Sequence, residues 1–224
     1  MSEKNIRKEN KDTTMEVVFI LDRSGSMCGL ERDTIGGFNS MLKKEKKQSS
    51  NIIWSTILFD DQIEVIHDRV PIRKVQPLTS DEYYVRGSTA LLDAVGCAID
   101  TTVGIYRDTI RSHVPDKTLF VITTDGMENS SIRYTYRDIK RKITKEQEKY
   151  GWKFIFLGAN IDAAAEGGRI GIRASNSATY LNDDMGIACN YSAVGAAMDK
   201  MARGFDLDGS ELESVREDCA KRGR

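Results

Sequence analysis

The stretch MEVVFILDRSGSM, residues 15–27, decides the fold class of this chain. It opens with a short, largely apolar run rich in β-branched side chains, which predicts a strand buried on both faces. The run stops at Asp22, and a polar turn that contains glycine follows. Beyond the turn, Ile35, Phe38 and Leu42 recur at spacings of three and four residues, which predicts a helix. This part of the sequence therefore predicts a strand, a turn and then a helix.

Two later segments repeat this pattern. The runs KTLFVIT (117–123) and WKFIFL (152–157) predict further buried strands, with helical spacings between them. Buried strands that alternate with helices are typical of an α/β fold with a parallel sheet covered on both faces. Residues 62–70 follow the strand expected at 51–59 too closely for a crossover, so they predict one antiparallel strand.

The composition limits the classes of partner. Of 224 residues, 40% are hydrophobic and 30% charged, so the chain can bury a core. The 33 basic and 34 acidic residues leave a net charge of −1, which gives no electrostatic reason for nucleic acid or anionic membrane as a partner. No apolar run approaches eighteen residues, so no membrane span is predicted.

The ends of the chain predict its organisation. Residues 1–14 are charged and lack the apolar middle of a secretory signal, so we expect a cytoplasmic protein with a short N-terminal extension. Residues 15–205 are expected to form one domain. Residues 206–224 are polar and are expected to form a C-terminal extension that frays.

Hydroxyl and carboxylate side chains gather at the predicted strand ends. Asp22, Ser24 and Ser26 alternate in the first turn, Thr89 precedes a predicted helix, and Asp125 follows the strand at 117–123. In such folds ligands collect outside the carboxyl ends of the strands. Hard oxygen ligands with few charges favour magnesium, or manganese, over zinc. The sequence therefore predicts a divalent cation site.

This combination resembles the von Willebrand factor A-type (vWA) domain, whose three-layer, Rossmann-like fold is shared with integrin I domains. The metal-ion-dependent adhesion site (MIDAS) of that family reads D-x-S-x-S, then threonine, then aspartate. All five positions are present, as Asp22, Ser24, Ser26, Thr89 and Asp125. The resemblance spans about residues 15–205, and the wording DRSGSM looks most like the stand-alone intracellular bacterial members.

The resemblance implies a non-catalytic function. In the family, the two serines hold magnesium directly, the two aspartates act directly or through water, and the threonine joins when the site opens. One coordination position stays free for an Asp or Glu carboxylate of a partner protein. Intracellular bacterial members commonly act in multiprotein complexes, often beside ATPases. Such domains also commonly switch by shifting the final helix.

The residues that flank the motif predict a rim for the partner. They are Tyr84, Arg86, Met127 and Glu128. Arg86 would favour an acidic partner, whereas Glu128 would disfavour one with several adjacent acids.

Two alternatives remain at this stage. A metal-dependent phosphatase of the haloacid-dehalogenase type would use D-x-D after the first strand, but Ser24 occupies the second acidic position and cannot serve as the proton donor. A structural subunit with a vacant site is the other alternative. The chain has neither a G-x-x-x-x-G-K-[ST] nor a G-x-G-x-x-G motif, so any coupled ATPase would be a separate chain.

Overall fold

The computed structural model describes residues 13–48 and 51–223, so residues 1–12 of the predicted N-terminal extension lie outside it. Six strands form one sheet in the order β3-β2-β1-β4-β5-β6. Their bounds are Met15–Asp22 (β1), Ile52–Phe59 (β2), Ile63–Pro71 (β3), Lys117–Thr124 (β4), Lys153–Ala159 (β5) and Ser177–Tyr180 (β6). β3 is antiparallel to β2, and every other neighbouring pair is parallel. The mostly parallel sheet with one antiparallel edge strand is therefore confirmed.

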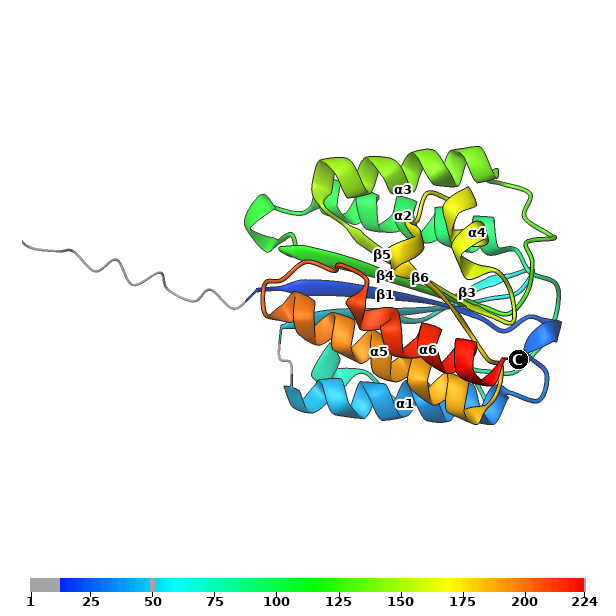
Figure 1. Cartoon of the computed structure of the whole chain (residues 1–224). Helices are drawn as coiled ribbons and strands as arrows, with labels where there is room; N and C mark the ends of the chain where they lie inside the picture. The colour runs from blue at the N-terminus through cyan, green and yellow to red at the C-terminus, as the bar shows by residue number, and fades with distance from the viewer. Residues whose placement is uncertain (1–12, 49–50, 224) are drawn as a thin grey trace, which may run out of the picture.

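Helices cover both faces of this sheet. One face carries α1 (Glu31–Gln48), α5 (Asp184–Ala202) and α6 (Glu213–Arg222), and the other carries α2 (Leu91–Asp108), α3 (Tyr136–Tyr150) and α4 (Ala163–Arg169) (Figure 1). Short 3₁₀ turns occur at Gly25–Met27, Ile72–Lys74, Arg111–His113, Ala174–Asn176 and Ser210–Leu212. The predicted three-layer α/β architecture is confirmed.

The packing of β1 explains why most of its residues are apolar. Val17, Phe19 and Leu21 pack into the core that includes α1 and α5, whereas Val18 and Ile20 pack into the core that includes α2 and α3. Successive side chains of a strand point to opposite faces. Because both faces are covered, both sets must be apolar.

The topology brings the ends of β1 and β4 together. The chain leaves β1 towards β2 on one side of the sheet, and later crosses back to place β4 on the other side of β1. The crossover helices α1 and α2 lie on opposite faces (Figure 1). Leu21 pairs with Thr123, so Asp22 stands beside the last residue of β4 and Asp125 lies just beyond. This is the reversal point at which α/β folds bind ligands.

The C-terminal segment is part of the packed structure. Leu212 and Val215 are each about 1% exposed within the core on the α1 and α5 face. Arg222 of α6 binds the carboxylate of Asp183, which caps the first turn of α5 through the amide of Gly186. The expected fraying is therefore wrong for the described part of this segment, because its few apolar residues share one buried face. Within residues 13–48 and 51–223, no helix is long and apolar enough to cross a membrane.

Candidate metal site

Asp22 is the last residue of β1 and is buried, at 1% exposure. Its Oδ1 accepts a hydrogen bond from the backbone N–H of Ser24 at 2.7 Å, which turns the chain sharply after the strand. Its Oδ2 accepts from the hydroxyl of Thr124 on β4 at 2.6 Å. The turn after β1 therefore holds one carboxylate oxygen, and the neighbouring strand β4 holds the other.

A chain of hydroxyl groups links the other four predicted ligands. The hydroxyl of Thr89 donates to Ser24 Oγ at 3.0 Å, and Ser24 Oγ lies 3.3 Å from Ser26 Oγ. Ser26 Oγ in turn donates to Asp125 Oδ1. The structure thus brings together all five residues that the motif predicts, from three separate loops.

Backbone contacts hold these loops in register. The carbonyl of Gly87 accepts from the amide of Gly25 at 3.1 Å, which ties the Thr89 loop to the first turn. Gly87 has a φ of +67°, a backbone conformation that favours glycine, and a Cβ there would lie 2.2 Å from Asp61 Oδ1. The amide of Thr89 donates to Asn129 Oδ1 at 2.9 Å, which ties the same loop to the segment after Asp125.

The space between the hydroxyls depends on Gly126. A Cβ at this position would lie 2.8 Å from Thr89 Oγ1 and 3.2 Å from Ser26 Oγ. Asn182, in the loop between β6 and α5, donates through Nδ2 to Asp125 Oδ2 at 3.4 Å, while its Oδ1 is buried without a hydrogen-bond partner. A close backbone approach and a spare buried oxygen are both features of a cation site.

The chemistry of this donor set fits magnesium or manganese. It offers two carboxylates and three hydroxyls, all hard oxygen ligands. No group of three or more His, Cys, Asp and Glu side chains suited to a metal occurs among the described residues. A cation at this edge of the sheet would therefore depend on the hydroxyls of Ser24, Ser26 and Thr89.

Burial dominates the electrostatics of the two carboxylates. It raises the pKa of Asp22 to about 6, although hydrogen bonds from Thr124 and Ser24 oppose the shift. Burial also raises the pKa of Asp125, against the hydrogen bond from Ser26. Two partly desolvated carboxylates at one site favour a positive charge between them.

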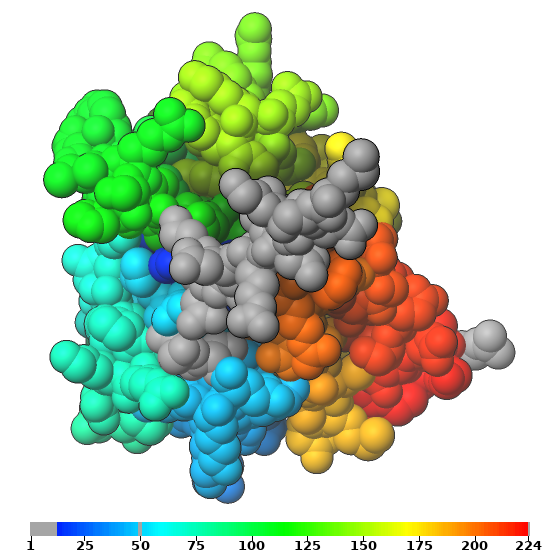
Figure 2. Space-filling model, turned by 90° about the vertical axis from the view of Figure 1, so that its left-hand side faces the viewer, coloured from blue at the N-terminus to red at the C-terminus, as the bar shows by residue number. Residues whose placement is uncertain are grey.

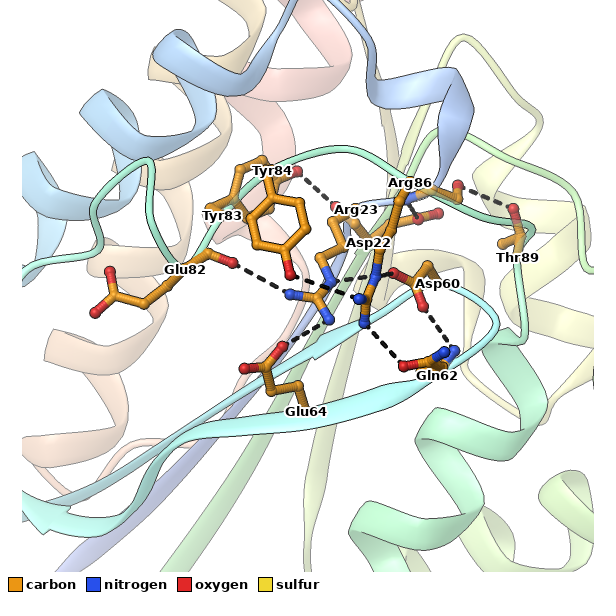
Figure 3. A network of polar contacts seen from close by, with 11 residues as sticks. Asp22, Arg23, Asp60, Gln62, Glu64, Glu82, Tyr83, Tyr84, Arg86 and Thr89 are labelled. Carbon is orange, nitrogen blue, oxygen red and sulfur yellow. Dashed lines mark hydrogen bonds and ion pairs between the residues drawn. The ribbon is translucent and has the colours of Figure 1, made fainter.

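A buried ion network supports the loop that carries Thr89 (Figure 3). Arg23 is fully buried, with Nε 3.2 Å from Asp60 Oδ2 and Nη2 2.7 Å from Glu64 Oε2. Arg86 also donates to Asp60 Oδ2, and its backbone amide donates to the carbonyl of Arg23 at 2.9 Å. Burial alone would raise the pKa of Asp60, but the hydrogen bond from Arg86 and the nearby Arg23 guanidinium hold it below its usual range.

Tyr83 and Tyr84 have different surroundings in this network. The hydroxyl of the buried Tyr83 donates to the carbonyl of Asp22 at 2.6 Å, so it anchors the loop to β1. Tyr84 is 43% exposed, and the centroid of its ring lies 5.2 Å from the Arg23 guanidinium and 5.5 Å from that of Arg86. Only Tyr84 is therefore available to a partner.

The four predicted rim residues divide into two groups. Tyr84 and Met127 expose about half of their surface. Arg86 is held by Asp60, and Glu128 accepts hydrogen bonds from the amides of Leu92, Ser130 and Ser131. Glu128 therefore caps the start of α2 and joins it to the segment after Asp125, a role that the sequence does not indicate.

Comparisons with known proteins were made on this fold. No protein-family model matches the chain, and no curated protein matches it. Several solved structures are similar to it. A von Willebrand factor type A protein from Catenulispora acidiphila is 15% identical, with a TM-score of 0.56 over 83% of this chain and 42% of that one. The ArnB paralog VWA2 from Sulfolobus acidocaldarius is 15% identical, with a TM-score of 0.53 over 79% of this chain and 43% of that one.

This chain has the vWA fold. Proximal thread matrix protein 1 from the mussel byssus, in a structure with a zinc-occupied MIDAS motif, is also similar: 15% identical, with a TM-score of 0.53 over 82% of this chain. The chain spans 42–45% of the length of these three proteins. At such identities the likeness establishes the fold, and the role of the vWA site in this chain must be argued from its own residues.

Proposed function

We propose that this vWA chain is a non-catalytic recognition module that binds an acidic side chain of another protein through a divalent cation. Asp22, Ser24, Ser26, Thr89 and Asp125 would hold the ion, which we propose to be magnesium, with manganese as a substitute. When bound, the ion would offer a Lewis-acidic position to a partner's Asp or Glu carboxylate.

The hydroxyl chain from Thr89 through Ser24 and Ser26 to Asp125 carries this proposal. Three loops converge on it, and each is tied to another by backbone contacts, so the donors are arranged before any ion arrives. The two carboxylates supply −2, which offsets the +2 of the cation. A neutralised ion at an exposed edge can accept one further anionic ligand without a large electrostatic penalty.

The surface around the site indicates what else the partner presents. Eight large hydrophobic side chains are exposed among the described residues. Four of them lie on the loops and the helix start at this edge: Tyr84, Met127, Ile132 and Met185. Exposed apolar groups that surround a polar centre are typical of protein interfaces. We therefore propose a partner whose acidic residue is flanked by apolar side chains.

Cation binding is the first test. Titration calorimetry with MgCl₂ and MnCl₂ should detect one site, and magnesium should raise the midpoint of thermal unfolding. Both effects should be lost in Ser24→Ala/Ser26→Ala. Wild-type magnesium affinity in this double variant would contradict the proposed ligand set.

Partner binding is the second test. Wild-type chain and Asp22→Ala are immobilised in parallel, with MgCl₂ or with EDTA, and retained proteins are identified by mass spectrometry. A true partner should be retained only by the wild type with magnesium, and an ATPase-containing complex is the first assembly to look for.

Thr89→Ala should weaken partner binding more than magnesium binding, and an Asp or Glu of the partner should be essential. Equal retention in EDTA would exclude the cation mechanism.

The alternatives make different predictions. A phosphatase would hydrolyse p-nitrophenyl phosphate with magnesium, but Ser24, at the second position of the motif, contributes only a hydroxyl bonded to Thr89 and near Ser26. A structural subunit with a vacant site would show no stabilisation by magnesium. We expect no turnover and a clear stabilisation. The cytoplasmic location stays a prediction.

A further inference from the structure

A sizeable cavity lies far from the metal site, at the opposite end of the sheet. It has a volume of about 640 Å³ and lies between the end of α2, the segment before β4, and the end of α3. Figure 2 shows this end of the molecule, with the segment before β4 in green and the end of α3 in yellow-green. Small-molecule sites in proteins commonly have volumes of 300–1,000 Å³.

Aromatic side chains form much of the wall. Trp152 is 5% exposed, and its ring meets that of Tyr106 edge to face, with centroids 5.5 Å apart. The hydroxyl of Tyr106 is occupied by Glu16 and Thr118 in the sheet, which leaves the ring to line the cavity. Tyr150 stands at the mouth and is 55% exposed. Rings at an angle to one another favour a ligand with an apolar or cationic surface.

One of the lining residues, Glu146, has an unpartnered carboxylate oxygen. Glu146 lines the cavity and is 2% exposed, at a position where α3 otherwise buries Ile139 and Ile143. Its Oε1 lies 3.3 Å from Lys145 Nζ, whereas its Oε2 is buried and has no hydrogen-bond partner. A buried carboxylate oxygen without a partner is costly, so a ligand that donates to it would gain free energy.

The charges at the mouth do not favour an anion. Arg107 is bound to its neighbour Asp108, with Nε 3.0 Å from Oδ1. Arg111 and Asp116 add one charge of each sign to the lining. The charges of Arg111 and Asp116 therefore balance, and Glu146 is the buried carboxylate among the lining residues.

We propose that this cavity binds an alkylammonium group, with its cation at the Glu146 carboxylate and its carbon chain against Tyr106, Tyr150 and Trp152. An ammonium group donates hydrogen bonds to a carboxylate and is attracted to aromatic faces. The group can belong to a small amine or to a lysine side chain of another protein, and both present the same chemistry. This binding would be independent of the proposed cation site.

The two tryptophans of the chain provide a local readout. Trp54 lies in the core on the other face of the sheet, whereas Trp152 lines the cavity. In ¹H–¹⁵N spectra of the full chain, 2-phenylethylammonium should shift the indole signal of Trp152 and leave that of Trp54 unchanged. 2-Phenylethanol, its neutral counterpart, should bind at least tenfold more weakly. Equal binding of the amine and the alcohol, or a shift of neither signal, would overturn the proposal.

Matched variants test the role of the carboxylate. Glu146→Gln keeps the size and removes the charge, so it should weaken amine binding at least tenfold without changing the binding of the alcohol. Lys145→Gln removes the lysine that contacts Oε1 and should tighten amine binding a few-fold. Tyr150→Ala, at an exposed position, should weaken both ligands. Unchanged amine affinity in Glu146→Gln, in a variant with wild-type spectra elsewhere, would exclude the carboxylate as the recognition group.

An experiment with short peptides distinguishes the two sources of the ammonium group, a small amine and a lysine side chain. N-acetyl-Gly-Lys-Gly-amide is compared with the same peptide carrying norleucine in place of lysine. Binding of the lysine peptide alone would identify a protein partner, and binding of phenylethylammonium alone would identify a small amine. Either result supports the cavity as an ammonium site, whereas binding of neither would refute it.

Discussion

Asp22 and Glu45 are both carboxylates that the fold buries almost completely, at 1% and 0% exposure, but the two regions treat them differently. At the end of β1, both oxygens of Asp22 accept hydrogen bonds, from Ser24 and from Thr124. Between α1 and α5, neither oxygen of Glu45 has a hydrogen-bond partner. Burial alone therefore does not define a binding site.

The difference lies in the backbone around each group. A strand end frees amides and hydroxyls to surround a carboxylate, whereas a helix uses its own amides internally. Glu45 faces α5 at Gly195, where an added Cβ would lie 3.2 Å from its Oε1. The strand end thus supplies an oriented charge for a ligand, and the helix interface leaves a charge that weakens the fold.

The largest expected effect is at Asp22. Asp22→Ala removes a −1 ligand and should weaken magnesium binding at least about 100-fold, because a charged donor at the ion has no substitute nearby. Calorimetry measures the affinity, and circular dichroism checks that the fold survives. Magnesium affinity within threefold of wild type would show that Asp22 is not a ligand of the ion and that its burial, like that of Glu45, does not mark a binding site.

Gly126→Ala should have the next largest effect. The added Cβ would approach the hydroxyl of Thr89 to 2.8 Å and displace it from its place beside Ser24. We expect magnesium binding to fall about tenfold, or about 1.4 kcal/mol. Gly104→Ala in α2 is the control, because a Cβ there meets no atom within 4 Å. If both variants bind magnesium with the same affinity, the space beside Gly126 is not needed for magnesium binding.

Glu45→Gln tests the other side of the comparison through pH. Burial raises the pKa of Glu45 to about 7 from an ordinary 4.5, with Asp199 adding to the shift and Lys44 opposing it. The folded state thus holds this proton more tightly than the unfolded chain, so its contribution to stability is full below pH 4.5 and is lost as the pH rises through about 7.

Glu45→Gln should therefore be more stable than wild type at pH 8, by on the order of 1–3 kcal/mol, and lose this advantage towards pH 5. Urea unfolding at several pH values measures the difference. The exposed Glu148→Gln should show no such trend. A gain that is independent of pH would show that Glu45 is not the titrating group.

The smallest expected effect is at Asn182. Asn182→Ala removes the amide that donates to Asp125 at 3.4 Å, a long contact, and should weaken magnesium binding only about two- to fivefold. Asn176→Ala, in the turn before β6, is the control. An effect as large as that of Asp22→Ala would make Asn182 a ligand of the ion.

The sequence predicts the fold correctly, and its motif identifies five residues that the fold brings together, because both depend on short patterns. The largely apolar run of β1 is visible in residues 15–21, and the motif places each donor after a strand or before a helix. The contacts that support the site are different. Asn129 meets Thr89 from 40 residues away, and Asn182 meets Asp125 from 57 residues away. No local pattern marks such pairs.

The predicted rim residues also have contacts that the sequence does not indicate. Arg86 and Glu128 look like surface charges in the sequence, but Arg86 is held by Asp60 and Glu128 by the amides at the start of α2. Conversely, Arg23 occupies a variable position of the motif and is fully buried. Which charges pair internally depends on how distant loops meet, and single-sequence patterns do not encode that meeting.

The place of Asp22 at the end of a central strand has a mechanical consequence. β1 is paired on both sides, with β2 over eight residues and with β4 over seven. A pull exerted at Asp22 along β1 and resisted by β2 and β4 loads both ladders in shear. A ladder in shear must break its bonds together, whereas a short edge strand such as β6 can peel away bond by bond. The site is therefore anchored where the sheet best withstands tension.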